Sequence, residues 1–592
     1  MSKPMTSGRD LTSVATSWFT DKLIAVDTET TGLQVYEPSV QPTFVSWWDH
    51  TDHGDGCRVL PGEVPETIAK RCSSRSWTKL FFNAKFDIPI LRKAGITVRG
   101  PIIDVYPMCQ MAMPKMKDSD SHSLKNLTRR IFNDPYLEEL EIKKWSRKES
   151  KGIGHAPDHL LFPYAIKDAR RTIDLFFYTR GFFDDNNQWD VLHKEMMFTR
   201  VLLSMEEVGM QIDPSTVEHF LQLTRSKSQK IRAKLCELTD QPAFNPNASK
   251  QVVAAIFHGG PGAPTPTRFT KKTGAIQCNK LALIETPSEI GNLVLKWRKI
   301  AKTTQTYLSN FIKLADPQDV IHASINQNGA RTGRLSCSDP NLTNLPRPSE
   351  SALGQIRECF TPRSNFRYLF ADYAQLEIRI QAHWTKERHI IRAIRDGLDL
   401  HDETCRKVLK KSPRDKEMRY IGKKLNLAMQ YGMGKEKFAD TVLVDSDGKI
   451  RISLVDSSNY VDAFWAGHPK LKEFFAAVEK EVANTGGVVN AYGRFMPVDP
   501  RTPYKGVNYK VQSTAADLVK DRMRKLYYGL LRGLKSRMLM QIHDEILFEI
   551  HDDERWLVQP IKELMEEHDR FEVPLTVDLE WSKTSWADKR SF

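Results

Sequence analysis

The chain has 592 residues, too many for one hydrophobic core to organise, and its 40% hydrophobic and 27% charged residues are typical of globular proteins with two to four domains. The formal net charge of +13 favours a polyanionic partner such as DNA or RNA. No apolar run approaches the roughly 20 residues that span a bilayer, and the eight cysteines form no C-x-x-C pair, which argues against a zinc ribbon and for free thiols in a reducing cytosol.

The first predicted element is a short buried strand at residues 22–27, after which strand and helix signals alternate to about Phe182 and predict an α/β domain. Asp27 and Glu29 stand two residues apart at the end of this strand, so both side chains face the same side. Two adjacent carboxylates repel each other unless a divalent cation neutralises them. This pair is therefore a candidate metal site.

Two further acids follow in the same third of the chain. Asp87 ends the segment 83–87, which follows the apolar residues 80–82. Asp168 follows Tyr164 by four residues, which places these two side chains on one helix face. Solvated surface acids are the ordinary alternative for any single one of these residues.

The ordered set Asp-x-Glu, Asn-x-x-Phe-Asp and Tyr-x-x-x-Asp, with the segment 122–127 between the last two, resembles the motifs of the DnaQ-like 3′→5′ exonucleases over residues 20–180. The resemblance implies an RNase H-like fold whose four acids bind two divalent ions, Mg²⁺ with Mn²⁺ as a possible substitute. The implied ligands are Asp27, Glu29, Asp87 and Asp168. Tyr164 would orient the attacking water.

A polar break at residues 184–187 predicts a domain boundary. Long helices with charged faces are expected from Trp189 to about Ile312, interrupted by a flexible loop at 259–264.

Two apolar runs in the last part of the chain each carry acids. Residues 366–382 predict a strand that runs into a helix and contain Asp372. Residues 538–550 predict a hairpin with His543-Asp544-Glu545 at its turn. Acids inside apolar runs are costly to bury without a metal ion, although a polar turn is the ordinary alternative for Asp544 alone.

A helix is predicted at residues 414–431, where Arg419, Lys423, Leu427 and Tyr431 recur every four residues and form one stripe. Two cations, an apolar group and a ring suit the phosphates, sugar and base of a nucleotide. A solvated basic helix would account for the two cations but not for Leu427 and Tyr431.

These three blocks, in this order, resemble motifs A, B and C of the family A DNA polymerases, the family of bacterial DNA polymerase I. Segments 332–336, 340–346, 512–517, 244–251 and 573–575 extend the resemblance over residues 190–592. It implies a right-hand fold with an antiparallel palm sheet and helical fingers and thumb. The expected division is an exonuclease domain at 1–185 and a polymerase domain at 186–592, with the thumb at about 190–325, the palm at about 326–400 and 500–592, and the fingers at about 401–499.

The resemblance also assigns roles for phosphoryl transfer from deoxynucleoside triphosphates (dNTPs) to a primer. Two Mg²⁺ would be held by Asp372, Asp544 and the backbone carbonyl of Tyr373. The triphosphate would be gripped by Arg419, Lys423 and His401, although a surface histidine is the ordinary alternative for the last. The rest of the nucleotide would contact Gln375, Glu377, Leu427 and Tyr431, with Glu377 excluding a 2′-OH. The primer-template DNA would contact Arg334, Asn341, Asn508, Gln512 and His543.

The chain departs from the family pattern at four positions: Leu427 replaces an aromatic residue, Thr343 a glutamine, Ser513 a glycine and Tyr504 a basic residue. The compact layout resembles phage polymerases, with no 5′ nuclease and no room for a thioredoxin-binding thumb insertion. A phage role implies replication in the cytoplasm of an infected bacterium, away from membranes, beside a helicase, a primase and a single-strand-binding protein.

Two other functions stay open. The chain could be an exonuclease whose C-terminal region binds DNA without catalysis, or a nucleic-acid scaffold with both sites inactive. Asp372, Lys423 and Asp544 argue against the first, and the complete set of acids argues against the second.

Overall fold

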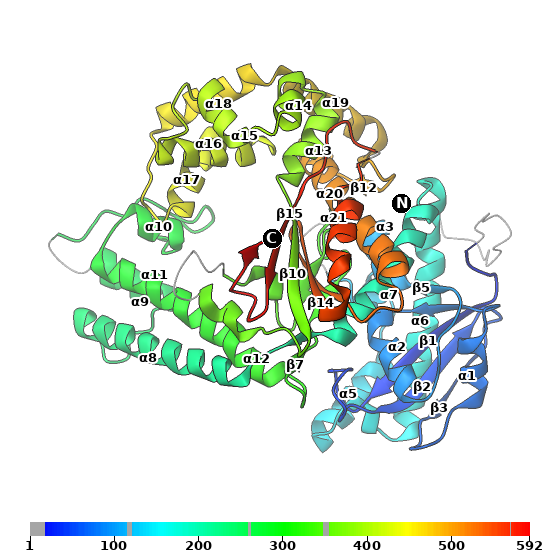
Figure 1. Ribbon diagram of the computed structural model, residues 1–592. Coiled ribbons are helices and arrows are strands. Elements are labelled where there is room, and N and C mark those ends of the chain that lie inside the picture. Colours follow the sequence, from blue (N-terminus) through cyan, green and yellow to red (C-terminus); the bar gives the residue numbers. More distant parts are fainter. Residues whose placement is uncertain (1–17, 115–120, 259–261, 347–353, 569) are drawn as a thin grey trace.

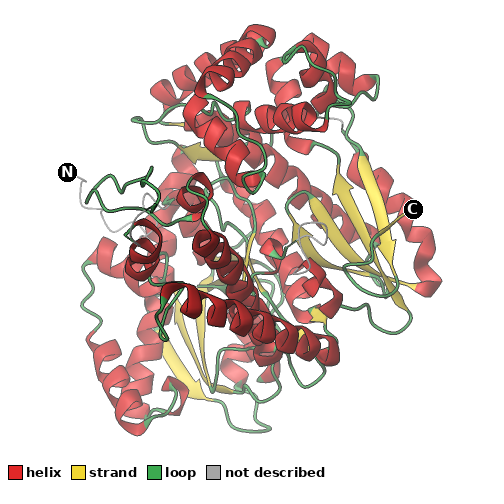
Figure 2. Ribbon diagram, turned by 90° about the vertical axis from the view of Figure 1, so that its left-hand side faces the viewer, coloured by secondary structure: helices red, strands yellow, loops and turns green. Residues whose placement is uncertain are grey.

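The computed structural model describes residues 18–114, 121–258, 262–346, 354–568 and 570–592. An α/β half at the N-terminus packs beside a larger half that contains the remaining chain (Figure 1). Each half has its own five-stranded sheet, and the C-terminus lies at the second of them (Figure 2). Among the described helices, none is long and apolar enough to cross a bilayer.

The first sheet has the order β3-β2-β1-β4-β5, with β1 antiparallel to β2 and parallel to β4. Its strands are β1 (Leu23–Thr30), β2 (Pro42–Asp49), β3 (Gly54–Arg58), β4 (Thr78–Phe81) and β5 (Ile102–Asp104). The helices of this half are α1 (Glu66–Ser73), α2 (Ala84–Lys93), α3 (Val105–Ala112), α4 (Leu124–Phe132), α5 (Leu137–Glu149) and α6 (Asp158–Asp185). This is the mixed α/β sheet expected of an RNase H-like domain.

Strand β1 is covered on both faces, which explains its continuous apolar run. Leu23 and Ala25 belong to a core shared with α3 and α6, whereas Ile24 and Val26 belong to a core shared with α1 and α2. Alternation along the strand therefore turns Asp27 and Glu29 toward the side of α6.

The predicted helical segment after residue 189 is confirmed. Its helices are α7 (Trp189–Val208), α8 (Pro214–Thr239), α9 (Ser249–Phe257), α10 (Lys280–Glu285), α11 (Glu289–Lys302) and α12 (Ser309–Leu314). A π-helical stretch, Thr303–Leu308, joins α11 to α12. The predicted loop at 259–264 lies partly outside the described residues.

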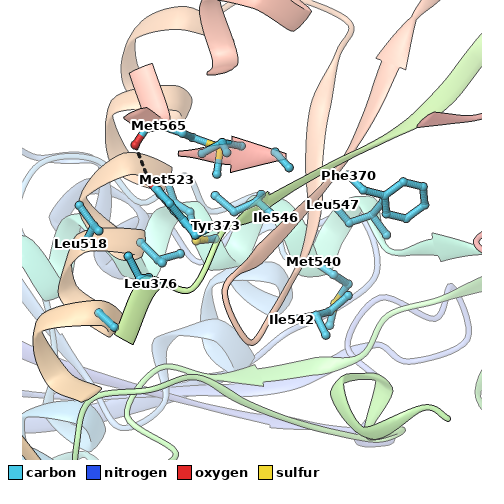
Figure 3. Packing of buried hydrophobic residues seen from close by; sticks show 14 of the residues in the cluster. Phe370, Tyr373, Leu376, Leu518, Met523, Met540, Ile542, Ile546, Leu547 and Met565 are labelled. Atoms are coloured by element: carbon cyan, nitrogen blue, oxygen red, sulfur yellow. Dashed lines mark hydrogen bonds between the residues drawn. The ribbon is translucent and has the colours of Figure 1, made fainter. Parts of the chain in front are cut away.

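The second sheet has the order β13-β14-β10-β15-β16 and is antiparallel throughout, as expected for the palm. Its strands are β10 (Phe366–Tyr373), β13 (Arg537–Ile542), β14 (Glu545–His551), β15 (Val577–Ser582) and β16 (Arg590–Ser591). Helices α13 (Leu376–Thr385), α20 (Lys505–Lys525) and α21 (Val558–Glu566) pack nearby. Figure 3 shows this core, where the Tyr373 hydroxyl donates to the carbonyl of Met565 at 2.7 Å.

The helices that directly follow α13 form an arch above the second sheet (Figure 1), and all of them except α14 fall at about 401–499, where the fingers are expected. They are α14 (Arg388–Arg395), α15 (Leu400–Lys407), α16 (Lys416–Met429), α17 (Lys435–Asp445), α18 (Leu454–Gly467) and α19 (Pro469–Thr485), followed by the hairpin β11 (Gly487–Val489) and β12 (Phe495–Pro497).

One sequence prediction is corrected here. The helix expected to reach Tyr431 ends at Met429, and Tyr431 lies in the turn that follows. Gly432 adopts a φ of +63° there, and the N–H of Tyr431 donates to the carbonyl of Ala428 at 3.2 Å. A left-handed glycine of this kind commonly terminates a helix.

Candidate active sites

The four predicted acids of the N-terminal half come from three elements. Asp27 and Glu29 lie on β1, Asp87 lies in the first turn of α2 and Asp168 lies on α6. Burial raises the pKa of Asp27 well above its usual value, and the charges of Asp87, Glu29 and Asp168 raise it further. The structure therefore brings all four carboxyl groups into one electrostatic cluster.

This cluster has the chemistry of a divalent-cation site. Burial, more than the neighbouring charges, raises the pKa of Glu29 to about 8 and that of Asp87 to about 8. A bound cation would relieve the mutual repulsion, and carboxylate oxygens are the ligands that Mg²⁺ prefers. The four carboxylates are therefore the right type of donor, although no group of three acidic, histidine or cysteine side chains among the described residues is already arranged around a metal position.

Two cations that the sequence did not single out stand beside these acids. Lys125 of α4 bonds to the Tyr164 hydroxyl and lies 3.9 Å from the Asp168 carboxylate. Arg171, one turn after Asp168 on α6, donates to it at 3.0 Å. Tyr164 is buried one turn before Asp168, as predicted. The i,i+3 spacing could have pointed to Arg171, but the approach of Lys125 depends on tertiary packing.

Asp104 is another residue that sequence reasoning missed. Its carboxylate accepts the backbone N–H groups of Asn83 and Ala84, each at 2.9 Å, and that of Tyr106 at 3.1 Å. It therefore caps the start of α2, which carries Asp87, as well as the start of α3. The alternating pattern around β5 contains no signal for this double cap.

In the second half, the sheet brings Asp372 and Asp544 together. Asp372 near the end of β10 stands opposite Glu545, and the N–H of Tyr373 donates to the backbone carbonyl of Asp544 at 3.3 Å. Asp372 is exposed. Burial raises the pKa of Asp544, although the charges of Arg334 and His543 lower it. The Tyr373 ring points into the core, so only its backbone lies at this site (Figure 3).

The turn between β13 and β14 holds Asp544 in place. It consists of His543 and Asp544, and His543 adopts a left-handed φ of +57°. Two-residue hairpin turns commonly require such a conformation. The predicted hairpin is confirmed, with Glu545 as the first residue of β14 rather than part of the turn.

Glu377 links three elements next to these acids. It lies in the first turn of α13 and bonds to both Arg334 and the Tyr431 hydroxyl. Burial raises its pKa, while Arg334 opposes the rise and Asp544 adds to it. Gln375 takes the N-cap position of the same helix with a φ of +52°.

Helix α16 presents the predicted stripe to solvent. Lys423 and Leu427 are exposed, and Leu427 retains 39% of its surface. Arg419 is held by the carboxylates of Asp402 at 2.6 Å and Asp399 at 2.5 Å. Three of the four predicted stripe residues therefore share one face of α16, whereas Tyr431 lies beyond its end, and the first cation is already paired.

His401 lies beside this stripe at the start of α15 and is buried rather than on the surface. Burial lowers the pKa of His401, and the charges of Lys423 and Arg419 lower it further, whereas the charge of Asp399 raises it. Its Nδ1 contacts the side-chain amide of Asn426 at 3.1 Å.

A cavity of about 230 Å³ lies between the turn that carries Asp544 and α20. Its lining includes Arg334, Asn341, Thr343, His543 and Asp544. The Thr343 hydroxyl donates to the Asn341 side chain at 2.7 Å.

The remaining predicted DNA contacts lie on α20, outside the lining of this cavity. Asn508 and Gln512 are one helical turn apart there, and the Asn508 side-chain oxygen is buried without a hydrogen-bond partner among the described residues. Ser513 is fully buried and bonds to the Lys510 carbonyl, whereas Tyr504 is 46% exposed.

Residues 215–588 match the family described as DNA polymerase family A, and residues 6–178 match a 3′-5′ exonuclease family. The chain therefore belongs to DNA polymerase family A.

Similar proteins include DNA polymerase I of Synechocystis sp., 26% identical over 94% of this chain and 59% of that protein. DNA polymerase I of Helicobacter pylori strain J99 is 30% identical over 76% of this chain and 49% of that protein. The chain thus spans about half the length of these relatives. The POL domain of Pol1 from M. smegmatis, solved in complex with DNA primer-template and dNTP, has a TM-score of 0.79 at 21% identity and 95% coverage of each chain, which establishes the fold.

Proposed function

We propose that the protein is a template-directed DNA polymerase that also removes nucleotides from the 3′ end of the primer. The observation that carries the polymerase assignment is the placement of Asp372 and Asp544 at one end of the palm sheet, where Asp372 lies opposite Glu545 and the N–H of Tyr373 donates to the carbonyl of Asp544, in a chain of this family. The exonuclease assignment rests on the buried cluster of four acids around Asp27.

In the polymerase site, Asp372, Asp544 and the backbone carbonyl of Tyr373 would hold divalent metal ions. When bound at either acidic site, such ions supply Lewis-acid activation and charge neutralisation for phosphoryl transfer. Lys423 would grip the triphosphate and donate a proton to the departing pyrophosphate. Arg419 would have to release or share Asp399 and Asp402 to join it, because both carboxylates hold its guanidinium.

The nucleotide would lie between α13 and α16. Glu377 would press against the sugar and leave no room for a 2′-OH, and its bond to Tyr431 would keep the carboxylate in place. Leu427 would contact the sugar and His401 the triphosphate, and Gln375, at the N-cap of α13, would also contact the nucleotide. The primer and template would contact Arg334, Asn341, Asn508, Gln512 and His543, where minor-groove acceptors allow contacts that do not depend on sequence.

In the exonuclease site, the metal ligands would be Asp27, Glu29, Asp87 and Asp168, and Tyr164 would orient the water that attacks the phosphodiester. Lys125 bonds to the Tyr164 hydroxyl and would fix its direction. The finer assignment to phage replication in the cytoplasm of an infected bacterium, with Mg²⁺, a helicase, a primase and a single-strand-binding protein but no thioredoxin clamp, is a hypothesis that rests on the motif resemblance alone.

Primer extension and excision by three variants of the full chain test the proposal. Asp27→Ala with Glu29→Ala is expected to abolish removal of a mismatched 3′ end and to leave extension largely intact. Asp544→Ala is expected to abolish extension and to spare excision of single-stranded DNA. Asp553→Ala, an exposed acid nine residues further on, is the matched control and should retain both activities.

The alternative, an exonuclease with a non-catalytic C-terminal region, predicts excision without any extension by the unmodified chain. Loss of both activities in the Asp27→Ala Glu29→Ala variant would contradict the assignment of two separate sites.

A further inference from the structure

The tip of the thumb touches the edge of the fingers. We call residues 262–286 the thumb tip and residues 435–451 the fingers edge. Helix α10 of the thumb tip packs against α17 of the fingers edge, although the two are separated by about 150 residues of sequence. In Figure 1 the fingers arch over from α13 and descend at α17 onto α10.

Two ion pairs join these surfaces. The guanidinium of Arg268 binds Glu285 within the thumb tip and Asp440 on α17, both at 2.6 Å. The Lys280 ammonium lies 2.6 Å from the carboxylate of Asp447. In each of these two pairs the thumb tip contributes the cation and the fingers edge contributes the acid.

The backbone of the fingers edge also comes close to the thumb tip. Gly448 adopts a φ of +81°, and a Cβ atom there would meet a methyl group of Ile284 at 2.9 Å. The hydrogen bond from Lys280 lowers the pKa of Asp447, so this acid is charged at neutral pH. Close packing and opposite charges therefore occur at the same contact.

The thumb, the palm and the fingers are linked into a continuous ring of contacts. The palm joins the thumb and the fingers at their bases, and the contact between α10 and α17 joins them at their ends (Figure 1). We propose that this contact is a clasp that closes around DNA and retains it during synthesis. The inference rests on the proposed polymerase function. The palm acids lie on the palm and the exposed stripe of α16 lies on the fingers, two of the three parts that the clasp links.

The clasp is suited to repeated opening. The paired side chains keep 30–63% of their surface exposed. Exposed ion pairs stabilise a contact only weakly and are screened by salt. DNA can therefore enter when the pairs separate, and each remade pair slows its escape.

The test changes the fingers edge, where neither acid is assigned a role in either active site. Asp440→Asn with Asp447→Lys removes one ion pair and turns the other into a repulsion between two lysines. Adding Lys280→Asp to this variant recreates the second pair with its charges exchanged. Lys234→Glu is the matched control, because it breaks an exposed ion pair with Glu237 on α8 of the same thumb.

Each protein extends a singly primed circle in the presence of a trap, on an Asp27→Ala Glu29→Ala background. The product length from one binding event is expected to fall about three- to tenfold in the Asp440→Asn Asp447→Lys variant, with the first-nucleotide rate unchanged. Lys280→Asp should restore part of the length, and Lys234→Glu should not alter it. The ratio of parent to variant length should approach one as salt rises.

Unchanged product length in the variant, or an equal fall in the first-nucleotide rate, overturns the clasp. A parent protein that cannot extend the primer at all instead overturns the proposed function. The two failures are thus distinguishable in one experiment.

Discussion

Leu427 lies on the exposed face of α16, one turn after Lys423, and keeps 39% of its surface. In the proposed site it contacts the sugar of the incoming nucleotide. A leucine side chain cannot replace the hydrogen bond that a dideoxynucleotide loses with its 3′-OH. We therefore expect the protein to discriminate against dideoxynucleotides.

Leu427→Tyr is predicted to increase dideoxynucleotide incorporation about tenfold or more, because one hydrogen bond of about 1.5 kcal/mol corresponds to a tenfold change in rate. Leu427→Phe supplies a ring without a hydroxyl and should leave discrimination high. The measurement is the single-turnover ratio of deoxy to dideoxy incorporation on an Asp27→Ala background. Equal ratios for the two variants would show that residue 427 does not face the sugar.

At the scale of secondary structure, Asp104 shows how one side chain can set the start of a functional helix. Burial raises its pKa to about 6, against the three backbone N–H groups that favour the charged form. Those N–H groups belong to the beginnings of α2 and α3. Because Asp87 lies in the first turn of α2, the position of its carboxylate depends on this cap.

Asp104→Ala is predicted to lower excision about tenfold or more, since each buried N–H left without an acceptor costs about 1–3 kcal/mol. Asp104→Asn keeps one acceptor oxygen and should lose less. Single-turnover excision of a mismatched 3′ end measures the effect, with extension as the internal reference. Ser288→Ala, which removes the cap of α11 in the thumb, should leave excision unchanged. A normal excision rate for Asp104→Ala would remove this residue from any positioning role.

Local patterns explain which parts of the structure the sequence could predict. The two-residue period placed Asp27 with Glu29, and the 3.6-residue period placed Arg419, Lys423 and Leu427 on one face. The same period extended the predicted helix beyond its end at Met429, because a repeat of side-chain types does not reveal the left-handed turn at Gly432.

Such local patterns do not predict contacts between segments that are distant in the sequence. Lys125 reaches Tyr164 across 39 residues, and Arg268 reaches Asp440 across 172. Neither pair follows a period, because each depends on how whole elements dock, although Lys125 lies within segment 122–127 of the exonuclease resemblance. The acids of both sites were therefore predictable, and Arg171 could have been found from its i,i+3 spacing to Asp168, whereas the contact between Lys125 and Tyr164 could not.

At the scale of the whole molecule, the two halves are joined by helices α2 and α7. Lys85 of α2 is buried, bonds to Glu206 of α7, and donates to the carbonyl of Ile325 at 2.8 Å. On the same two helices, Arg92 and Glu207 form a second ion pair at 2.5 Å that is about half exposed. Asp87 lies two residues after Lys85, so the docking of the halves and the geometry of the exonuclease site share one helix.

The two ion pairs provide a matched test of this docking. Lys85→Met leaves the buried Glu206 carboxylate without its partner, which typically costs about 3–5 kcal/mol. Arg92→Met breaks the exposed pair between the same helices, which typically costs about 0–1 kcal/mol. We expect Lys85→Met to lower the first transition in calorimetric unfolding by several degrees and to reduce excision, whereas Arg92→Met should change neither. Adding Glu206→Gln to Lys85→Met removes the stranded charge, keeps an acceptor for the Ile325 N–H, and should recover part of the loss. Similar shifts for Lys85→Met and Arg92→Met would mean that the buried pair does not hold the halves together.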